Sequence, residues 1–332
     1  MKAYRLTPGG GIDGIVQRDE PERQPGIGQA LVRMRATSLN YRDLGIARRA
    51  AEAIVPLSDG AGEVLAVGEG VTRVVPGDRV AGCFMPHWLD GDATPEYIRE
   101  ALGGGSTDGM LAEQVVLPAE ALVKLPGHMS YEEAATLPCA AVTAWNAIFE
   151  QSRPRPGQSV LLLGTGGVSI FGLQLGLLAG MRTIITSSSD EKLQRAARLG
   201  AHHGVNYRER EDWEQAVLDL TDGRGVDVVL EVGGSGTFAR SMAATRMGGS
   251  IVLIGGLAPD SGDAAGVPLV ARGIHVTRVY VGSRRMFDEM DRALELGQVR
   301  PVIDRVFDFS QAVDAYRYLE SQAHLGKVVI RV

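Results

Sequence analysis

Short apolar runs alternate with turn-forming sequence between residues 1 and 125. The segments Ala30–Ala36 and Glu63–Gly68 have the length and apolar content that are typical of strands, and Pro76–Asp78 has the composition of a tight turn. Several short strands that are separated by turns indicate an all-β unit. We therefore predict a compact β-barrel in this part of the chain.

The pattern changes at Ser130, which is followed three residues later by Glu133, the spacing of a capping box at a helix start. Beyond it, strand-like and helix-like segments alternate. We predict strands at Ser159–Leu163, Thr183–Thr186, Val226–Glu231 and Ser250–Ile254, one helix ending near Ala179 and another at Glu191–Leu199. Strands that alternate with helices predict a parallel, doubly wound sheet.

The C-terminal part returns to a mixed pattern. Its periodicity predicts helices near Met286–Leu296 and Gln311–Ser321, and the apolar run Lys327–Val332 predicts a final strand. A chain of 332 residues exceeds the size at which one hydrophobic core usually keeps growing, so we expect two domains. We expect the tail to fold back onto the barrel.

The bulk composition describes an ordinary globular chain. Hydrophobic residues make up 45% and charged residues 22%, and the formal net charge is −6 with both signs spread along the sequence. No basic field is present to hold phosphates, so a small-molecule substrate is a better expectation than nucleic acid. The sequence shows no secretory signal and no membrane span, and Cys83 and Cys139 alone make no disulfide framework. We expect a cytoplasmic protein.

A glycine-rich turn follows the first strand of the alternating region. Gly164 permits a tight turn, and Gly166 lets a pyrophosphate approach the backbone N–H groups at the start of the next helix. Ser169 occupies the third glycine position, so the match to the dinucleotide fingerprint is imperfect. A turn that binds nothing is the alternative, and the strand-turn-helix context favours dinucleotide binding.

The next strand tip holds Ser187, where NAD-binding proteins usually carry an acidic residue for the ribose hydroxyls. A hydroxyl leaves room for a 2′-phosphate and Lys192 supplies a counter-charge, so NADP is favoured over NAD. Asp190 is the competing candidate for a ribose-binding acid. It lies beyond the strand, and we interpret it as a helix cap.

Seven segments of the chain are similar in sequence to segments of one protein superfamily. They are Ser38–Asp43, Asp59–Val64, Pro76–Val80, Asp108–Glu113, Leu137–Trp145, the Gly164 loop and Asn206–Tyr207. Through them the chain resembles the medium-chain dehydrogenases/reductases, and specifically the zinc-free quinone oxidoreductases and zeta-crystallin. The resemblance implies an α/β protein with a GroES-like β-barrel catalytic domain (residues 1–125 and 282–332) and a Rossmann domain (residues 126–281). It also implies homodimers whose Rossmann sheets join edge to edge through His275–Val281.

Zinc-dependent relatives hold their catalytic metal with a Cys, a His in a Gly-His-Glu segment, and a later Cys or Asp. The matching places here hold Asn40, Ser58 with Asp59, and Cys139. A zinc site needs about three protein ligands, mainly imidazole or thiolate, and Asn and Ser replace them poorly. The region from Pro86 to Met110 also lacks the cysteines of a structural zinc lobe. We therefore expect no zinc and interpret Cys139 as a buried small side chain.

The resemblance also implies which residues contact the cofactor. Asn40 and Thr143 are expected to face the nicotinamide, and Lys327 is a further candidate whose alternative is a solvated side chain. The other implied contacts are Gly166, Gly167 and Val168 at the pyrophosphate, Val232, Gly255, Val281 and Gly282 at the ribose and ring, and Lys192 and Tyr207 beside the 2′-phosphate. For Tyr207 the alternative is a surface ring that covers a helix edge.

Without a metal, hydrogen-bond donors must polarise a carbonyl group. Conjugate hydride delivery places enolate charge on an oxygen that such donors can hold, so we predict NADPH-dependent reduction of quinones or α,β-unsaturated carbonyl compounds. The candidate catalytic residues are Asn40, Tyr41 and Arg42. Tyr41 either donates a proton or lines the pocket, and Arg42 either acts in the cleft or pairs with Asp43. A metal-free alcohol dehydrogenase and a nucleotide-binding protein with little turnover remain as alternatives.

Overall fold

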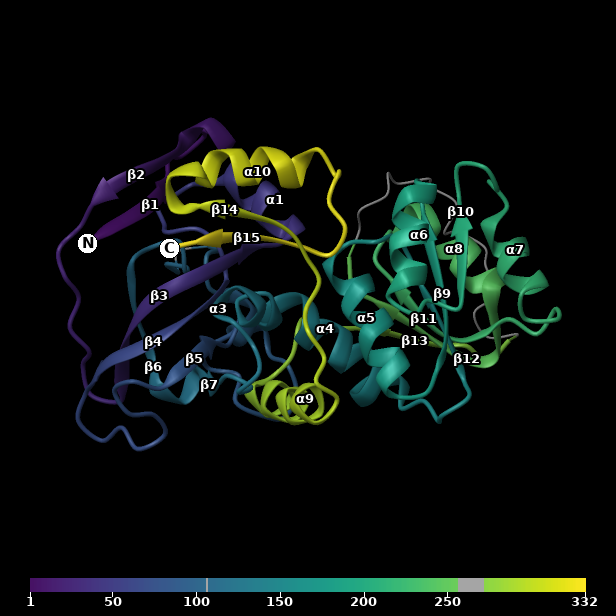
Figure 1. Ribbon diagram of the computed structural model, residues 1–332, viewed down its shortest axis with the longest axis horizontal. Helices are drawn as coiled ribbons and strands as arrows, with labels where there is room; N and C mark the ends of the chain where they lie inside the picture. Colours follow the sequence, from purple (N-terminus) through teal and green to yellow (C-terminus); the bar gives the residue numbers. More distant parts are fainter. Residues whose placement is uncertain (106, 256–271) are drawn as a thin grey trace. The chain divides into compact units, whose positions relative to one another are not determined.

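The computed structural model describes residues 1–105, 107–255 and 272–332, and the chain divides into two compact units (Figure 1). Unit 1 consists of Met1–Val142 and Val281–Val332, and unit 2 consists of Thr143–Tyr280. Among the described residues, no helix combines the length and the apolarity that crossing a membrane requires.

Unit 1 is built on a seven-stranded sheet with the order β14-β15-β3-β4-β5-β7, in which β6 also pairs with β3. Its strands are β3 (Gln29–Leu39), β4 (Asp59–Val67), β5 (Arg79–Gly82), β6 (Gln114–Pro118), β7 (Leu122–Lys124), β14 (Ile303–Asp308) and β15 (Lys327–Arg331). A separate antiparallel hairpin consists of β1 (Lys2–Leu6) and β2 (Ile15–Asp19).

Five α-helices accompany these strands: α1 (Tyr41–Arg49), α2 (Pro95–Arg99), α3 (Tyr131–Ala134), α9 (Arg284–Leu296) and α10 (Ala312–Glu320). Short 3-10 turns are η1 (Ile12–Gly14), η2 (Ala119–Ala121) and η5 (Phe309–Gln311), and η3 (Leu137–Ala141) is a π-helical turn. The core includes Leu39, Leu57, Met110 and Tyr316, all less than 2% exposed. Burying a leucine of this kind stabilises the fold by about 1.5–3 kcal/mol relative to exposing it.

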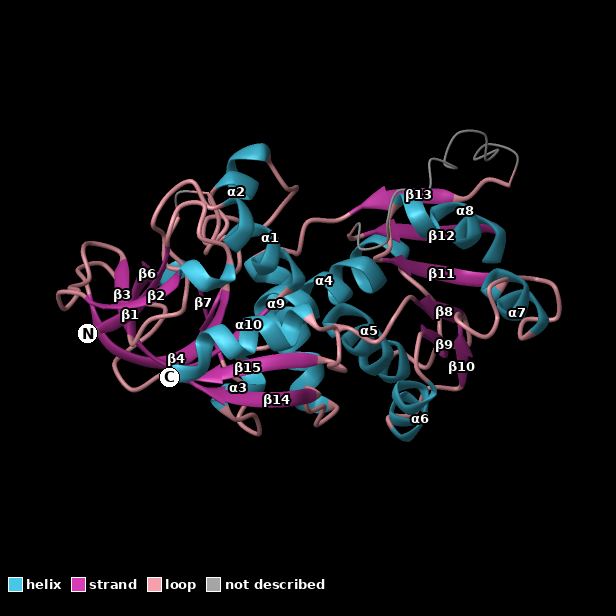
Figure 2. Ribbon diagram, turned by 90° about the horizontal axis from the view of Figure 1, so that it is seen from above, coloured by secondary structure: helices cyan, strands magenta, loops and turns pink. Residues whose placement is uncertain are grey.

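The C-terminal tail completes the barrel, which confirms the predicted fold class. β15 lies antiparallel to β3, with Val328 opposite Leu39, and β14 runs parallel to β15. α10 packs against β15 and β3. Figure 2 shows β14 and β15 side by side with α10 over them.

Unit 2 is a six-stranded parallel sheet with the order β10-β9-β8-β11-β12-β13. Its elements are α4 (Val142–Trp145, which begins at the last residue of unit 1), the π-helical η4 (Asn146–Ser152), β8 (Ser159–Leu162), α5 (Gly167–Leu178), β9 (Arg182–Ser187), α6 (Asp190–Arg198), β10 (His203–Asn206), α7 (Trp213–Asp219), β11 (Val226–Glu231), α8 (Ser235–Ala244), β12 (Thr245–Leu253) and β13 (His275–Arg278).

Helices cover both faces of this sheet, as a doubly wound fold requires. Leu161 and Val229 belong to a core cluster with residues of α7 and α8. Their strand neighbours Leu162 and Leu230 point the other way and meet α5 at Gly172. This alternation follows from the two-residue repeat of side chains along a strand, and it explains why these strands are continuously apolar.

Two groups of elements differ from the predicted pattern. In unit 2, β10, α7 and α8 were not predicted. β10 is a short edge strand, His203–Asn206, that carries little apolar sequence. Residues 126–142 pack with unit 1, since α3 contacts β3, β4 and β15. The capping box before α3 is confirmed, with Ser130 N donating to Glu133 Oε2 at 2.8 Å and Glu133 N to Ser130 Oγ at 3.2 Å.

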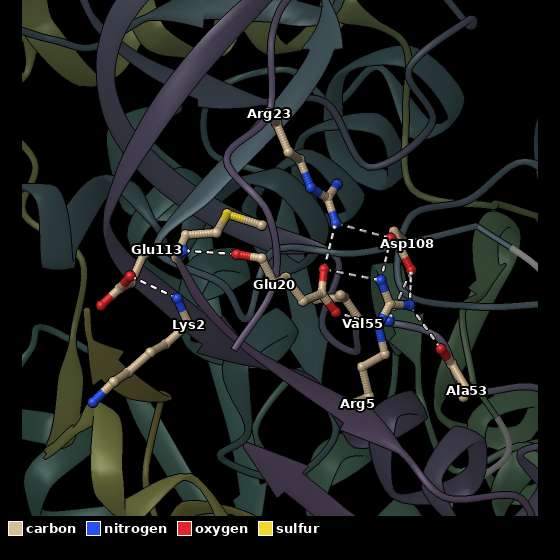
Figure 3. Close-up of polar contacts among 9 residues, drawn as sticks. Lys2, Arg5, Glu20, Arg23, Ala53, Val55, Asp108 and Glu113 are labelled. Atoms are coloured by element: carbon tan, nitrogen blue, oxygen red, sulfur yellow. Dashed lines mark hydrogen bonds and ion pairs between the residues drawn. The ribbon is translucent and has the colours of Figure 1, made fainter. Parts of the chain in front are cut away.

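An ion network fastens the β1–β2 hairpin to the barrel (Figure 3). Arg5 donates to Glu20 Oε2 at 3.1 Å and to Asp108 Oδ1 at 2.9 Å, and Arg23 donates to Asp108 Oδ2 at 3.2 Å. The hydrogen bond from Arg5 lowers the pKa of Glu20. Burial raises the pKa of Asp108, but the hydrogen bonds from Val55 and Arg5 have the larger combined effect, so this pKa is lowered as well. Because Val55 N donates to Asp108 at 2.9 Å, the network also anchors the segment that leads into β4.

Candidate active site

The site in unit 1 forms where three strand ends meet. β3 ends at Leu39, β4 begins at Asp59 and β15 begins at Lys327. Both neighbours run antiparallel to β3, with Ser38 opposite Asp59 and Leu39 opposite Val328. The register therefore brings Asn40, Asp59 and Lys327 to one place.

Lys327 is the centre of this cluster. Its ammonium donates to Asn40 Oδ1 at 2.6 Å and to Leu39 O at 2.7 Å, and it lies 3.7 Å from Asp59 Oδ2. The side chains of Lys327 and Asp59 are 3% and 0% exposed. Lys327 is thus a buried ion-pair partner and not the solvated side chain that was the alternative.

Asp59 is held by its neighbours on both oxygens. Ser58 Oγ donates to Asp59 Oδ1 at 2.7 Å, and the backbone N–H of Cys139 donates to Oδ2 at 3.2 Å. The Cys139 residue is only half-buried. Its thiol is nevertheless shielded from water, and burial together with the charge of Asp59 raises its pKa. The structure therefore brings together the three places that match zinc ligands in relatives, and it adds an ammonium that the sequence prediction did not place there.

Asn40 is fixed at its backbone as well as at its side chain. It is the N-terminal cap of α1, and its N–H donates to Asp43 Oδ2 at 2.6 Å. Asp43 is fully buried, and burial raises its pKa to about 6. The amide nitrogen Nδ2 of Asn40 is buried and has no hydrogen-bond partner. A buried donor without a partner is costly, so this atom is a candidate for contact with a bound group.

The backbone that leads into Asp59 is held in an unfavourable conformation. Leu57 has a φ of 69°, in the left-handed region that a leucine rarely adopts, and it is completely buried. Met110 N donates to Leu57 O at 2.8 Å, and Gly103 and Gly109 pack closely against it. A Cβ atom at Gly109 would lie 2.6 Å from Pro56 O. These contacts keep Leu57 in place and so set the position of Ser58 and Asp59.

The other two candidate catalytic residues lie differently. Tyr41 is 42% exposed at the first position of α1. Arg42 donates to Leu102 O at 3.0 Å, and its guanidinium lies 4.5 Å from the centre of the Phe84 ring. Arg42 thus ties α1 to the segments before and after α2, and no hydrogen bond or ion pair between its side chain and Asp43 is found among the described contacts.

The glycine-rich turn of unit 2 has the predicted conformation. Gly164 has a φ of 71°, and its N–H donates to Thr186 Oγ1 at 3.0 Å. Gly166 is the N-terminal cap of α5, and a Cβ atom there would meet nothing within 4 Å. Gly167 and Val168 form the first turn of the helix. The space beside Gly166 fits the approach of a phosphate group to the backbone.

Ser169 occupies the third glycine position of the fingerprint, and Gly172 provides the close packing of helix on strand that this glycine usually permits. Ser169 Oγ donates to Leu163 O at 2.6 Å. One turn later, a Cβ atom at Gly172 would lie 2.7 Å from Leu162 Cδ2 and 2.9 Å from Leu230 Cδ2. Gly172 therefore permits the close packing of helix on sheet, and the sequence prediction missed it because it lies outside the fingerprint.

Ser187 ends β9, as predicted, and is 2% exposed. Tyr207 N donates to Ser187 O at 3.0 Å, so the backbones of these two residues are adjacent, and the Tyr207 side chain is 41% exposed. Lys192 lies in the first turn of α6 and is half-buried. The interpretation of Asp190 as the helix cap is wrong, because Ser189 Oγ accepts from Lys192 N at 3.4 Å and Asp190 instead accepts from Asn206 Nδ2 at 2.8 Å.

The sequence prediction also missed Glu231, the last residue of β11. This carboxylate is completely buried and accepts hydrogen bonds from Gly233 N at 2.7 Å, Gly234 N at 3.0 Å and Thr237 Oγ1 at 2.6 Å. It shapes the turn that follows Val232. A strand of apolar residues that ends in Glu and is followed by Val-Gly-Gly is the signal that could have identified it.

The remaining predicted cofactor residues lie near the boundaries of strands and units. A Cβ atom at Gly255 would lie 3.0 Å from Val232 O, so these two residues are close to each other. Thr143 is a buried residue of α4 in unit 2. Val281 has a φ of 52°, and Gly282 packs against Val142 in unit 1.

Comparison with known proteins identifies the superfamily. The alcohol dehydrogenase GroES-like domain matches residues 26–127, and the zinc-binding dehydrogenase model matches residues 199–330. A zinc-type alcohol dehydrogenase-like protein of Schizosaccharomyces pombe is 44% identical over an alignment of 317 positions, which covers 92% of this chain and 91% of that protein. The chain is a medium-chain dehydrogenase/reductase.

Two further comparisons place this dehydrogenase/reductase in its superfamily. The quinone oxidoreductase of Pseudomonas aeruginosa is 30% identical over an alignment of 343 positions, which covers 99% of each chain. A crystal structure from Sinorhizobium meliloti, described as an alcohol dehydrogenase, has a TM-score of 0.91 and 38% identity and covers 100% of this chain and 99% of its own. The predicted family and the NAD(P)-dependent oxidoreductase activity are confirmed at this level.

Proposed function

We propose that this protein reduces quinones or α,β-unsaturated carbonyl compounds with NADPH and without zinc. The observation that carries the proposal is the buried Lys327 ammonium, which donates to Asn40 and lies 3.7 Å from Asp59. Asn40, Ser58 and Cys139 match the places where zinc-dependent relatives hold their metal. The Lys327 ammonium and the Asp59 carboxylate thus lie in this part of the site.

The residues present do not fit a zinc ion. The Lys327 ammonium would repel a divalent cation, and its hydrogen bond takes the side-chain oxygen of Asn40. Zinc sites need about three protein ligands, mainly thiolate or imidazole, and of Asn40, Ser58 and Cys139 only Cys139 offers one. Among the described residues, no group of three His, Cys, Asp or Glu side chains is suited to hold a metal. We derive no catalytic step through zinc.

The residues do fit a nicotinamide dinucleotide. The space beside Gly166 would take the pyrophosphate, and the unpartnered Asn40 Nδ2 would take a hydrogen-bond acceptor of the cofactor or the substrate. A 2′-phosphate would lie at Ser187, between Lys192 and Tyr207. Ser187 leaves no carboxylate at the strand tip to repel that phosphate, which is why we favour NADPH.

The chemistry requires one strong donor and one source of protons. When bound, the reduced nicotinamide supplies the hydride. Addition of hydride to the β-carbon of an enone moves charge to the carbonyl oxygen, and Asn40 Nδ2 would donate to that oxygen as its charge grows. One proton at the α-carbon then completes the reduction. Tyr41 or a water molecule would supply this proton, and Lys327 would not, since its hydrogen bonds go to Leu39 and Asn40.

Oxidation of an alcohol is the second candidate, because the chain is 30% identical to an alcohol dehydrogenase of Geobacillus stearothermophilus and 32% identical to an NAD-dependent alcohol dehydrogenase of known structure. A metal-free site cannot acidify an alcohol through a Lewis acid, so this reaction would need a general base. The third candidate, a nucleotide-binding protein with little turnover, predicts cofactor binding without reaction.

One panel of assays separates these candidates. Purified protein is mixed with NADPH or NADH and with quinones, enones, acrylates and aldehydes, and with NADP⁺ or NAD⁺ and primary alcohols. The proposal predicts the highest kcat/KM for a quinone or an enone with NADPH. Efficient oxidation of ethanol or benzyl alcohol without turnover of any quinone or enone would support the alcohol dehydrogenase instead.

We also propose a homodimer that forms through β13, the edge strand of the sheet in unit 2. The N–H of Val279 bonds inward to Leu253 O, so the alternate residues Val276 and Arg278 turn their backbone groups toward the edge that no described strand pairs with. Val276→Pro should therefore convert the dimer to a monomer in light scattering, while Leu296→Lys, at an 89% exposed leucine of unit 1, should not. A dimer that persists in Val276→Pro contradicts this arrangement.

A further inference from the structure

We infer that Lys327 is a positioning residue that locks the side-chain amide of Asn40, so that its NH₂ group alone faces a bound carbonyl or enolate oxygen. The inference rests on the proposed function, because it names the residue that orients the donor of that same site. It assigns to Lys327 a role different from direct contact with the cofactor.

The orientation of the amide follows from the chemistry of the ammonium. A protonated lysine has only donors, so the atom of Asn40 that lies 2.6 Å from Lys327 Nζ must be the carbonyl oxygen. The other atom of the planar amide group is therefore the nitrogen Nδ2, which is buried and has no hydrogen-bond partner in the protein. An asparagine without such a lock could turn its amide by half a rotation and present the oxygen instead.

Asp59 makes the lock stable. A buried ammonium without a counter-charge would lose its proton or disrupt the fold, and Asp59 lies 3.7 Å from it. Ser58 and the backbone of Cys139 in turn hold Asp59. The ammonium donates to Leu39 O and Asn40 Oδ1, and the Asp59 carboxylate that balances its charge lies 3.7 Å away.

The backbone of Asn40 is fixed independently. Its N–H donates to Asp43 Oδ2 at 2.6 Å at the start of α1. With the backbone and the side-chain oxygen both held, Nδ2 has one position before any ligand binds. A donor that is placed in advance stabilises charge in a transition state without reorganisation.

A double-mutant cycle tests whether Lys327 acts through Asn40. The variant Lys327→Met/Asp59→Asn removes the pair together, so that no uncompensated charge is left in the core. In the parent we expect it to lower kcat by about tenfold or more, since the loss of one oriented donor is of that size or larger. In an Asn40→Ala background the same pair should change kcat by less than about twofold, because the orientation it controls no longer exists.

Cofactor affinity distinguishes a lock from a direct contact. The dissociation constant of NADPH, measured by fluorescence titration without substrate, should change less than about threefold in Lys327→Met/Asp59→Asn, while kcat falls. Lys327→Arg, which keeps the positive charge, should recover part of kcat. Lys124→Met is a matched control at a 58% exposed lysine that pairs with Asp78, and it should match the parent in both measurements.

A spectroscopic measurement tests the lock without any turnover. The chain contains only three asparagines, Asn40, Asn146 and Asn206, so labelling with ¹⁵N-asparagine gives three side-chain NH₂ pairs. Asn40→Ala identifies its pair by loss of the signal. Removing the Lys327–Asp59 pair should shift and broaden the Asn40 signals and leave those of Asn146 and Asn206 in place.

These experiments can fail or succeed independently of whether the proposed substrate class is correct. The cycle is run on whichever reaction the protein catalyses, and the spectra need none, so a wrong substrate class does not decide the result. Equal losses of kcat in both backgrounds, a large rise in the NADPH dissociation constant, or unchanged Asn40 signals would each overturn the lock.

Discussion

The Lys327 ammonium donates a 2.6 Å hydrogen bond to Asn40 Oδ1 across 287 positions of sequence. The contact exists because β15 pairs with β3 and sets Val328 opposite Leu39, one residue before Asn40. The addition of β15 to the sheet of unit 1 thus also assembles the site.

Replacement of Asn40 should affect the chemical step. Asn40→Ala should lower kcat more than it raises KM, with an upper limit of about 2.7–4 kcal/mol, the cost of losing one donor from a well-formed oxyanion site. Asn40→Asp is the matched variant, because it keeps the shape and the contact with Lys327 but replaces the donor by an acceptor, and it should lose as much. Steady-state kinetics measure both. A raised KM with unchanged kcat would place Asn40 in ordinary substrate binding.

The preference for NADPH should depend on Ser187 and Lys192. Ser187→Asp places a carboxylate against the 2′-phosphate and should lower the ratio of NADPH to NADH affinity by roughly 10- to 100-fold, the range of a charged hydrogen bond. Lys192→Met should weaken NADPH alone, and Arg198→Met, at an exposed arginine of the same helix, is the control. Titration of both cofactors gives the ratio. If Ser187→Asp leaves it unchanged, the phosphate binds elsewhere.

Local features were predictable from the sequence. Gly164 and Gly166 belong to one strand-turn-helix unit, and their conformations depend on residues close by in the chain. The same holds for Ser130 and Glu133, whose two hydrogen bonds span three positions. Parallel strands that are buried on both faces are continuously apolar, which is why β8, β9, β11 and β12 were predicted.

Features that depend on strand register were not predictable. Nothing near Lys327 in the sequence indicates that Asp59 and Asn40 are its partners, because register between distant strands decides this. The burial of Glu231 likewise depends on α8, whose Thr237 and Ser241 donate to it. For Asp190, two neighbouring residues competed for one capping position, and the serine before it fills that position.

The strained Leu57 should make Gly109 intolerant of a side chain. A Cβ atom in Gly109→Ala would lie 2.6 Å from Pro56 O and would also meet the backbone of Leu57. Relief of this clash would move Leu57 and with it Asp59, so we expect a loss of about 1–3 kcal/mol of stability and a fall in kcat. Gly127→Ala is the control, since its Cβ would make an ordinary contact at 3.7 Å with Glu295. Urea unfolding that gives the same stability for both variants would contradict this account.

The ion network of the hairpin should stabilise the fold at neutral pH and not in acid. Folding lowers the pKa values of Glu20 and Asp108 below those of the unfolded chain. The two carboxylates therefore add to the free energy of unfolding at pH values above their unfolded-state pKa values, and this added stability is lost as the pH falls through their folded-state pKa values. Arg5→Met should therefore cost about 1–3 kcal/mol at pH 7, and this cost should shrink at a pH of about 3.

Arg317→Met is the control for this comparison. Arg317 pairs on the surface with Asp13, whose side chain is 80% exposed, so its removal should leave the free energy of unfolding unchanged. Urea unfolding of the parent and both variants at the two pH values makes the comparison. If Arg5→Met lowers the free energy of unfolding by the same amount at both pH values, the ion network is not the source of the pH dependence.

We propose that an ammonium–carboxylate pair and an oriented amide replace a metal in this dehydrogenase/reductase. The rate of NADPH oxidation with a quinone or enone substrate should be measured on protein whose zinc content has been determined by elemental analysis before and after treatment with a chelator. We predict full turnover at far less than one zinc per chain and no change on adding zinc. Stoichiometric zinc, with turnover that is lost to the chelator and restored by the metal, would contradict the account.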